Sequence, residues 1–162
     1  MGIINIVKNI KTIHNNDIAI IKIGQFYHVY GKDSYIISYL FDYKLNEIES
    51  IKTCGFPEKS INKVIAKLEE NKINYMVIDR RNNYKVDLVS NNKNLNKYDK
   101  YYYKAKEYIN IRSRIEKIYK FMLDDINKQD IKIIIKQMEE LINERRKIQS
   151  NWFYKKINCG YR

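Results

Sequence analysis

The chain has 162 residues, 44% of them apolar, and no apolar run approaches the length of a membrane span. The N-terminal segment has too short an apolar core to be a secretory signal, so we expect one cytoplasmic domain, or one domain with an appendage, and no membrane partner. Cys54 and Cys159 show no CxxC spacing, which argues against a disulfide framework or a zinc site. The net charge of +12 favours polyanionic partners, although a lysine surplus from the codon usage of an AT-rich genome is the competing explanation.

A helix and two strands are predicted at the N-terminus. Apolar residues at spacings of three and four predict an amphipathic helix over residues 3–13. The β-branched run Ile18–Gly24 predicts a strand that is buried on both faces. Residues Phe26–Tyr30 alternate as a second strand, whose even-numbered face carries Phe26 and His28.

Two helices with a strand between them are predicted next. Asp33 or Ser34 is expected to cap a helix over residues 35–43. Residues 46–56 alternate weakly between polar and apolar, which predicts a single strand. One apolar stripe predicts the second helix over residues 61–71.

Two further strands complete the first domain. Residues 73–80 form a strongly predicted strand, and residues 82–86 follow as its partner after a short turn. A leading helix followed by the order ββαβαββ predicts an α/β fold with a mixed sheet flanked by helices. Residues 1–89 are therefore assigned to one α/β domain.

The chain changes character after residue 89. Residues 90–97 are polar and Asn-rich, which predicts a linker. Residues 98–162 contain two apolar stripes separated by a polar turn, which predicts an antiparallel helical hairpin with a tail. Residues 97–162 hold 17 basic and 9 acidic side chains, so the positive charge is densest here. Such a hairpin must pack on the first domain, on a second copy in a homo-oligomer, or on another protein.

Three blocks between Asp17 and Arg80 follow one family pattern. They read IKIGQFYHVYGKDSY, CGFPEKSINKVIAKLEENK and INYMVIDR. In order and spacing they resemble the N-terminal mismatch-recognition domain (domain I) of MutS, the DNA mismatch repair protein. The first block matches the segment that holds a Phe-x-Glu motif after a Gly. The second matches the Gly-hydrophobic-Pro approach to a helix, and the third matches the strand that follows.

The resemblance implies roles for two residues of the first block. In the family, the Phe wedges beside a mispaired base from the minor groove and the Glu forms a hydrogen bond with that base. Phe26 takes the wedge position, and His28 stands where the family has Glu. A neutral imidazole donates one hydrogen bond and accepts one, whereas a carboxylate only accepts. Without that negative charge, we expect higher general affinity for nucleic acid and weaker mismatch discrimination.

Four cations are candidates for a phosphate path, because the turn after one strand can lie beside the end of another. They are Lys22, Lys32, Arg80 and Arg81. Read singly, each is an exposed surface charge, which is the competing interpretation. The competing interpretation of Phe26 is a buried strand aromatic, and that of His28 is an exposed strand residue.

The remaining MutS architecture has no counterpart in this sequence. The five glycines form no GxxxxGK[ST] loop, so no P-loop ATPase is expected. A freestanding domain followed by a basic helical segment is similar to the MutS-like accessory proteins of diversity-generating retroelements, in which a reverse transcriptase copies a template RNA with adenine errors. The resemblance implies a nucleic-acid-binding accessory factor for a DNA duplex or RNA–DNA hybrid. It would act with a reverse transcriptase and a helical-bundle protein.

We expect no enzyme activity and no metal or cofactor. His14 and His28 are the only histidines, and the chain contains neither HExxH nor GxSxG. The competing class is an oligomeric scaffold or protein-interaction module that binds a reverse transcriptase through its hairpin. An exposed Phe26 ringed by Lys and Arg would favour nucleic-acid binding. A buried Phe26, with apolar surface exposed only on the hairpin, would favour the scaffold.

Overall fold

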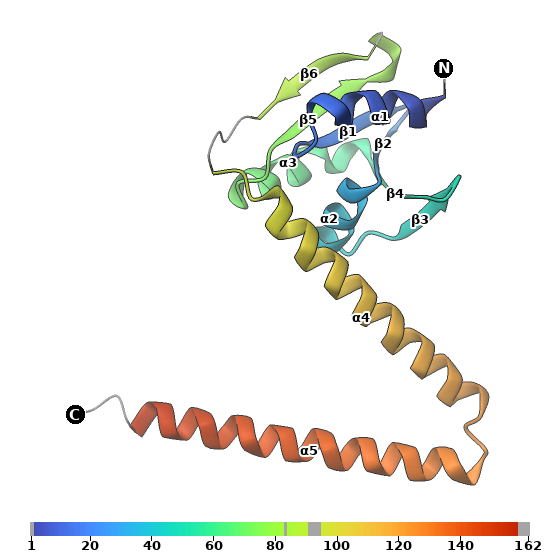
Figure 1. Ribbon diagram of the computed structural model, residues 1–162, viewed down its shortest axis with the longest axis vertical. Coiled ribbons are helices and arrows are strands. Elements are labelled where there is room, and N and C mark those ends of the chain that lie inside the picture. Colours follow the sequence, from blue (N-terminus) through green and yellow to red (C-terminus); the bar gives the residue numbers. More distant parts are fainter. Residues whose placement is uncertain (1, 83, 91–94, 159–162) are drawn as a thin grey trace. The chain divides into compact units, whose positions relative to one another are not determined.

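The computed structural model describes residues 2–82, 84–90 and 95–158, with side chains described except at 82 and 150–158. The chain divides into two compact units, residues 1–112 and residues 113–162 (Figure 1). The first unit contains the sheet, and the second is helical. The predicted linker and the predicted C-terminal tail lie partly outside the described residues.

Six strands of the described chain form one mixed sheet, in the order β3-β4-β2-β1-β5-β6. β1 and β5 are parallel, and all other neighbours are antiparallel. The predicted α/β fold with a mixed sheet is therefore confirmed. The strands are β1 (Ile18–Ile23), β2 (Phe26–Tyr30), β3 (Leu45–Ile48), β4 (Ile51–Pro57), β5 (Tyr75–Asp79) and β6 (Lys85–Val89). The helices of this unit are α1 (Ile3–Ile13), α2 (Lys32–Phe41), α3 (Ile61–Glu70) and the first part of α4 (Tyr98–Asp124).

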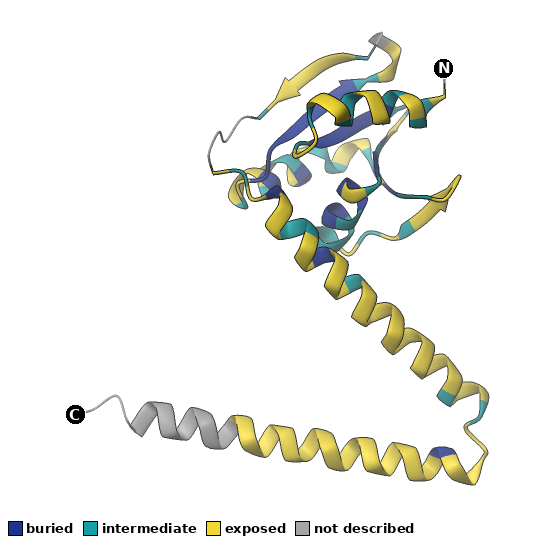
Figure 2. Cartoon of the chain, viewed as in Figure 1, coloured by how far each residue is buried: buried dark blue, intermediate teal, exposed yellow. Residues whose placement is uncertain are grey.

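The helices cover the two faces of the sheet unequally (Figure 2). α2, α3 and the first turns of α4 pack on one face, where Val29 and Phe56 are buried in the main core. α1 covers the other face, where Val7 packs against Ile21 and Tyr30. β1 lies between β2 and β5, so its first four residues are buried, as predicted for a strand covered on both sides.

The prediction of a single strand over residues 46–56 is wrong. The segment forms two antiparallel strands, β3 and β4, with Ile48 opposite Ile51. Glu49 and Ser50 make the turn between them, with φ angles of 48° and 62°. Positive φ at both central residues is the geometry of a tight hairpin turn. Neither residue is Gly, Asn or Asp, so the sequence carries no recognisable turn signal at this point.

Two local predictions also need correction. β6 starts at Lys85, three residues later than the predicted partner strand, because a short 3-10 turn over Arg80–Asn82 and a positive φ of 58° at Tyr84 come first. α2 starts at Lys32 after Gly31, and no side chain caps it. The cap expected at Asp33 is absent because that carboxylate points into the core.

The Asp33 carboxylate joins four elements of the first unit. It accepts hydrogen bonds from the Ala19 backbone N–H of β1 (2.9 Å) and the Tyr98 hydroxyl of α4 (2.5 Å). Nζ of Lys11, from α1, lies 2.8 Å from the same carboxylate. Burial raises the pKa of Asp33, while the Lys11 ammonium and the hydrogen-bond donors oppose that rise. This network fixes α1, α2 and the start of α4 around the first residues of β1.

The predicted helical C-terminal region is confirmed. The end of α4 is followed by the turn 125–128 and by α5 (Gln129–Asn158). Many large apolar side chains of residues 113–149 stay exposed, among them Ile118, Phe121 and Leu141 (Figure 2). None of the helices described has an apolar stretch of the length and purity needed to cross a bilayer.

Candidate nucleic-acid interface

Phe26 begins β2, directly after the two-residue turn Gly24–Gln25 that joins it to β1. Gly24 has a φ of 64°, a left-handed conformation that glycine adopts without strain. Phe26 is opposite Ile23 of β1 and Pro57 of β4, so these three side chains share one face of the sheet. Phe26 is 51% exposed. The hairpin end therefore presents an aromatic ring outside the core, with apolar neighbours on both adjacent strands.

His28 lies on the same face as Phe26 and rests on a glycine. It is opposite Gly55 of β4, and a Cβ added to Gly55 would lie 3.2 Å from Nδ1 and Cε1 of the imidazole. The ring also stacks on Tyr30, with 6.4 Å between ring centroids. Partial burial lowers the pKa of His28 below its ordinary value of 6.5. The side chain is consequently neutral at pH 7 and offers one donor and one acceptor.

Lys22 lies on the other face of the sheet from Phe26. It is opposite Tyr27, whose ring belongs to the main core, and its Nζ lies 5.9 Å from the centroid of that ring. The same Nζ lies 2.5 Å from a carboxylate oxygen of Glu58. The hydrogen bond that Lys22 donates to the Glu58 carboxylate is the main reason that the pKa of Lys22 is raised. Lys22 therefore does not border the Phe26 ring directly.

Arg80 and Arg81 follow β5 at the sheet end that also carries Phe26. The parallel register places Asp79 opposite Lys22, so Arg80 comes next to the end of β1. Two strand spacings then separate the Arg80 backbone from that of Phe26, roughly 10 Å. The positive charge of Arg80 lowers the pKa of Tyr30, against the larger upward effect of burial. The Arg81 backbone N–H donates to Asp79 Oδ1 at 2.8 Å.

Lys32 lies apart from these residues, at the first turn of α2. Its Nζ lies 5.2 Å from the centroid of the Tyr102 ring in α4. The six predicted residues therefore do not form one cluster. Phe26 and His28 share a face, and the two arginines follow a strand at the same sheet end. Lys22 lies at that end on the opposite face, and Lys32 lies on α2.

Sequence reasoning missed the residues that frame Phe26 and His28. Pro57 flanks the Phe26 ring, Gly55 makes room for the imidazole, and Glu58 holds Lys22. All three come from the CGFPE stretch, which the sequence suggested only as the end of the strand over residues 46–56 and the approach to a helix. Their connection with Phe26 depends on β4 pairing with β2, which the single predicted strand did not reveal.

The fold and this site together define a small mixed α/β domain that presents one aromatic side chain at a hairpin end. The model of the family MutS domain I matches residues 1–119. The chain belongs to the MutS domain I family. No curated protein matches the chain.

Proposed function

We propose that the protein is a nonenzymatic nucleic-acid-binding domain that prefers distorted or weakly paired duplexes. The exposed Phe26 ring, held at the hairpin end of a MutS domain I fold, is the observation that carries this proposal. An apolar ring that replaces a lost stacking partner lowers the free energy of a kinked or mispaired step. A fully paired base step has lost no stacking partner, so it offers the ring no such place.

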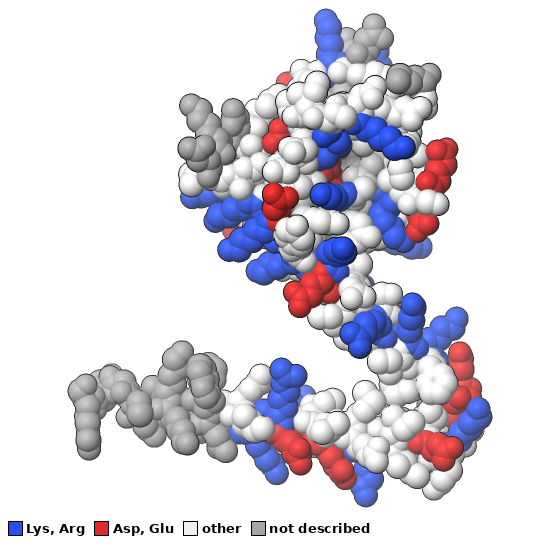
Figure 3. Space-filling view, in the orientation of Figure 1, with Lys and Arg blue, Asp and Glu red and all other residues white. Residues whose placement is uncertain are grey.

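The charge of the protein supports a polyanionic ligand. Lys and Arg side chains gather below α1 on the face of residues 1–112 seen in Figure 3. Phosphate contacts of this kind supply affinity without sequence preference and weaken with salt. Lys22 is engaged by Glu58, so Arg80 and Arg81 are the cations best placed to act with Phe26.

A neutral His28 supports binding that discriminates little between one mispaired base and another. Its imidazole can donate to a base acceptor or accept from a base donor, depending on which nitrogen carries the proton. A carboxylate at this position would repel nearby phosphates, and the imidazole does not. We therefore propose that distortion is recognised more strongly than the identity of the base.

The test compares Phe26→Ala with the parent chain on a duplex with one mismatch and on the matched duplex. We expect a loss of roughly 1–3 kcal/mol on the mismatched duplex, the range of aromatic stacking on bases, and a smaller loss on the matched one. Fluorescence anisotropy at low and high salt measures both affinities. Tyr103→Ala is the matched control, because it removes another exposed aromatic ring of the same unit. Equal losses on both duplexes would contradict the wedge.

We further propose that the domain serves a diversity-generating retroelement as an accessory factor of its reverse transcriptase. The MutS domain I match and the basic helical segment that follows the sheet support this role, in which the ligand is a DNA duplex or an RNA–DNA hybrid. A reverse transcriptase gene with a template repeat beside the gene, and co-purification of the two proteins, are the expected results. Consistent absence of such a neighbour would leave only general duplex binding.

One observation favours a second candidate function, a protein-interaction module. Residues 113–149 expose apolar side chains on both helices, such as Ile115, Ile134 and Ile148. An exposed apolar surface of this extent marks an interaction site. Under this alternative, the helical segment binds a protein partner and nucleic acid is not read. Undiminished partner binding by a chain that fails to bind any duplex would favour it.

A further inference from the structure

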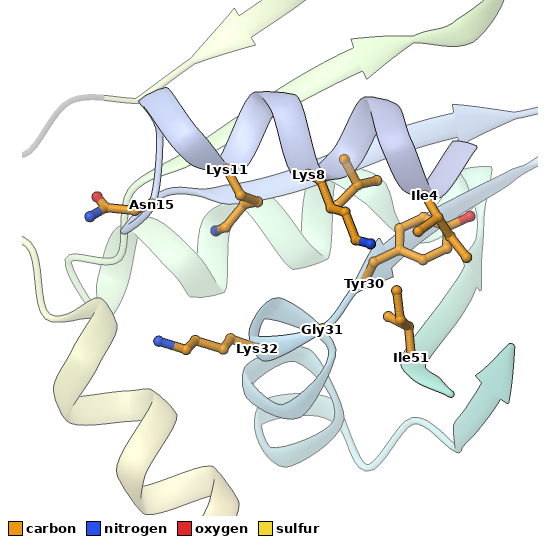
Figure 4. A pocket seen from close by; sticks show the side chains of 9 residues that line it. Ile4, Lys8, Lys11, Asn15, Tyr30, Gly31, Lys32 and Ile51 are labelled. Atoms are coloured by element: carbon orange, nitrogen blue, oxygen red, sulfur yellow. The ribbon is translucent and has the colours of Figure 1, made fainter. Parts of the chain in front are cut away.

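A cavity of about 310 Å³ lies between α1 and the junction of β2 with α2, within residues 1–112 (Figure 4). Ile4 and Val7 of α1, Tyr30 of β2 and Ile51 of β4 give it an apolar lining. Its volume is at the lower end of the range for small-molecule sites. The cavity therefore suits one compact, partly apolar group.

Three lysines surround this apolar lining: Lys8, Lys11 and Lys32. The Lys11 ammonium is neutralised by the buried Asp33 carboxylate. Lys8 and Lys32 form no ion pair among the described residues, and no acidic side chain lines the cavity. Two lysines at the cavity therefore have no acidic partner among the described residues, although the Lys32 ammonium lies 5.2 Å from the centroid of the Tyr102 ring in this conformation. An anionic group on the ligand would complement them.

The backbone at the cavity adds to this polarity. Gly31 lines the cavity with a φ of 58°, and a Cβ added there would meet no atom within 4 Å. It precedes the first turn of the ten-residue helix α2, which has no side-chain cap. The positive end of the helix dipole therefore reinforces Lys8 and Lys32.

The cavity lies on the same side of β2 as the candidate interface. Tyr30 shares the even-numbered face of the strand with Phe26 and His28, and the His28 ring stacks on it. Four residue steps along the extended strand take the chain from Phe26 to Tyr30, about 13 Å. This distance corresponds to about four base steps of a B-form strand. A nucleic acid held at Phe26 that runs along β2 would therefore reach the cavity.

We propose that the cavity binds one unpaired nucleotide of the nucleic acid that is distorted at Phe26. The base lies against the apolar lining, and the phosphate lies between Lys8 and Lys32. This inference rests on the proposed function, because the nucleic-acid strand would reach the cavity from the side of Phe26. It goes beyond that function by giving the domain a second contact that requires an unpaired base.

The first experiment uses thymidine monophosphate as the probe and the full ¹⁵N-labelled chain. We expect the amide signals of Gly31 and Lys32 to shift on titration. The variant Ile4→Trp fills the cavity without changing its charge and is expected to abolish these shifts. Unchanged spectra with the probe, or equal shifts in Ile4→Trp, would overturn the site. A glutamate-rich peptide that shifts the same signals, where the nucleotide does not, would identify a protein ligand instead.

The second experiment measures affinity for a mismatched duplex with and without one additional unpaired nucleotide, placed about four base steps from the mismatch. We expect the unpaired nucleotide to raise affinity about tenfold, the equivalent of one stacked base. Lys8→Ala and Ile4→Trp should remove this increment. Lys44→Ala, an exposed lysine outside the cavity, should retain it. An increment that survives in Lys8→Ala and Ile4→Trp would overturn the proposal.

The two proposals fail in different ways. If the Phe26 wedge is wrong, Phe26→Ala leaves the mismatch preference intact, while the amide shifts with thymidine monophosphate remain. If the cavity site is wrong, the shifts and the increment are absent, while Phe26→Ala still reduces mismatch binding. Thermal unfolding of each variant shows that it folds, so that a loss of binding is attributed to the site.

Discussion

The imidazole of His28 couples protonation to folding. Partial burial lowers its pKa below 6.5, so the unfolded chain takes up this proton more readily than the folded protein does. The contribution to stability is complete above about pH 6.5 and falls as the pH decreases through that value towards the lower folded pKa. We expect His28→Gln to remove this part of the pH dependence. Urea unfolding at about pH 5.5 and about pH 7.5 measures the change in the free energy of unfolding between the two pH values. An equal change in His28→Gln and in the parent chain would contradict this prediction.

Gly55 and His28 are expected to be energetically coupled. An added Cβ at Gly55 would lie 3.2 Å from the imidazole, which then has to move. We expect Gly55→Ala to cost about 1 kcal/mol in the parent chain and less in a His28→Ala background. A double-mutant cycle on the free energy of unfolding gives the coupling directly. Additive effects would show that the ring does not rest on this glycine.

Individual residues were predictable where a motif fixed their position in one strand. The block around Phe26 and His28 predicted the strand and the face that carries both residues, because the alternation is a local signal. The surroundings of Phe26 were not predictable. Pro57 and Gly55 come beside it only through the pairing of β2 with β4, a long-range register that local periodicity does not encode.

At the scale of elements, the Asp33 network is expected to be a major source of stability. Its carboxylate is buried and paired with Lys11, whose side chain is 20% exposed. Asp33→Asn leaves the ammonium without its counter-charge, so we expect a loss of about 3 kcal/mol. Asp42→Asn is the control, because Asp42 pairs with Arg112 on the exposed surface and should cost less than about 1 kcal/mol. Chemical denaturation that gives equal losses would contradict this ranking.

Elements with strong periodicity were predicted correctly, and those that depend on tertiary contacts were not. α1 and β1 follow from apolar spacing alone. The turn at Glu49–Ser50 and the late start of β6 require positive φ angles at residues other than glycine, which the sheet imposes. The uncapped start of α2 has a similar cause, since Asp33 is used by the core instead.

At the scale of the whole molecule, the apolar surface of residues 113–149 is expected to drive self-association. Leu141 is 65% exposed, and its neighbours on α5 include other exposed apolar side chains. Leu141→Lys should shift the full chain towards the monomer in sedimentation equilibrium. Asn143→Lys adds the same charge at a polar position of that helix and should leave the mass unchanged. If the parent chain is monomeric at every concentration measured, self-association is contradicted and the surface would instead bind a different protein.

The parallel pairing of β1 with β5 has a consequence for synthesis on the ribosome. β1 can pair with β2, and β2 with β4, soon after translation, but the second edge of β1 waits for a partner that begins only at Tyr75. Until then a row of backbone N–H and C=O groups on an isoleucine-rich strand stays open. The nascent chain is therefore most prone to misassociation, and most in need of a chaperone, before residue 79 has emerged.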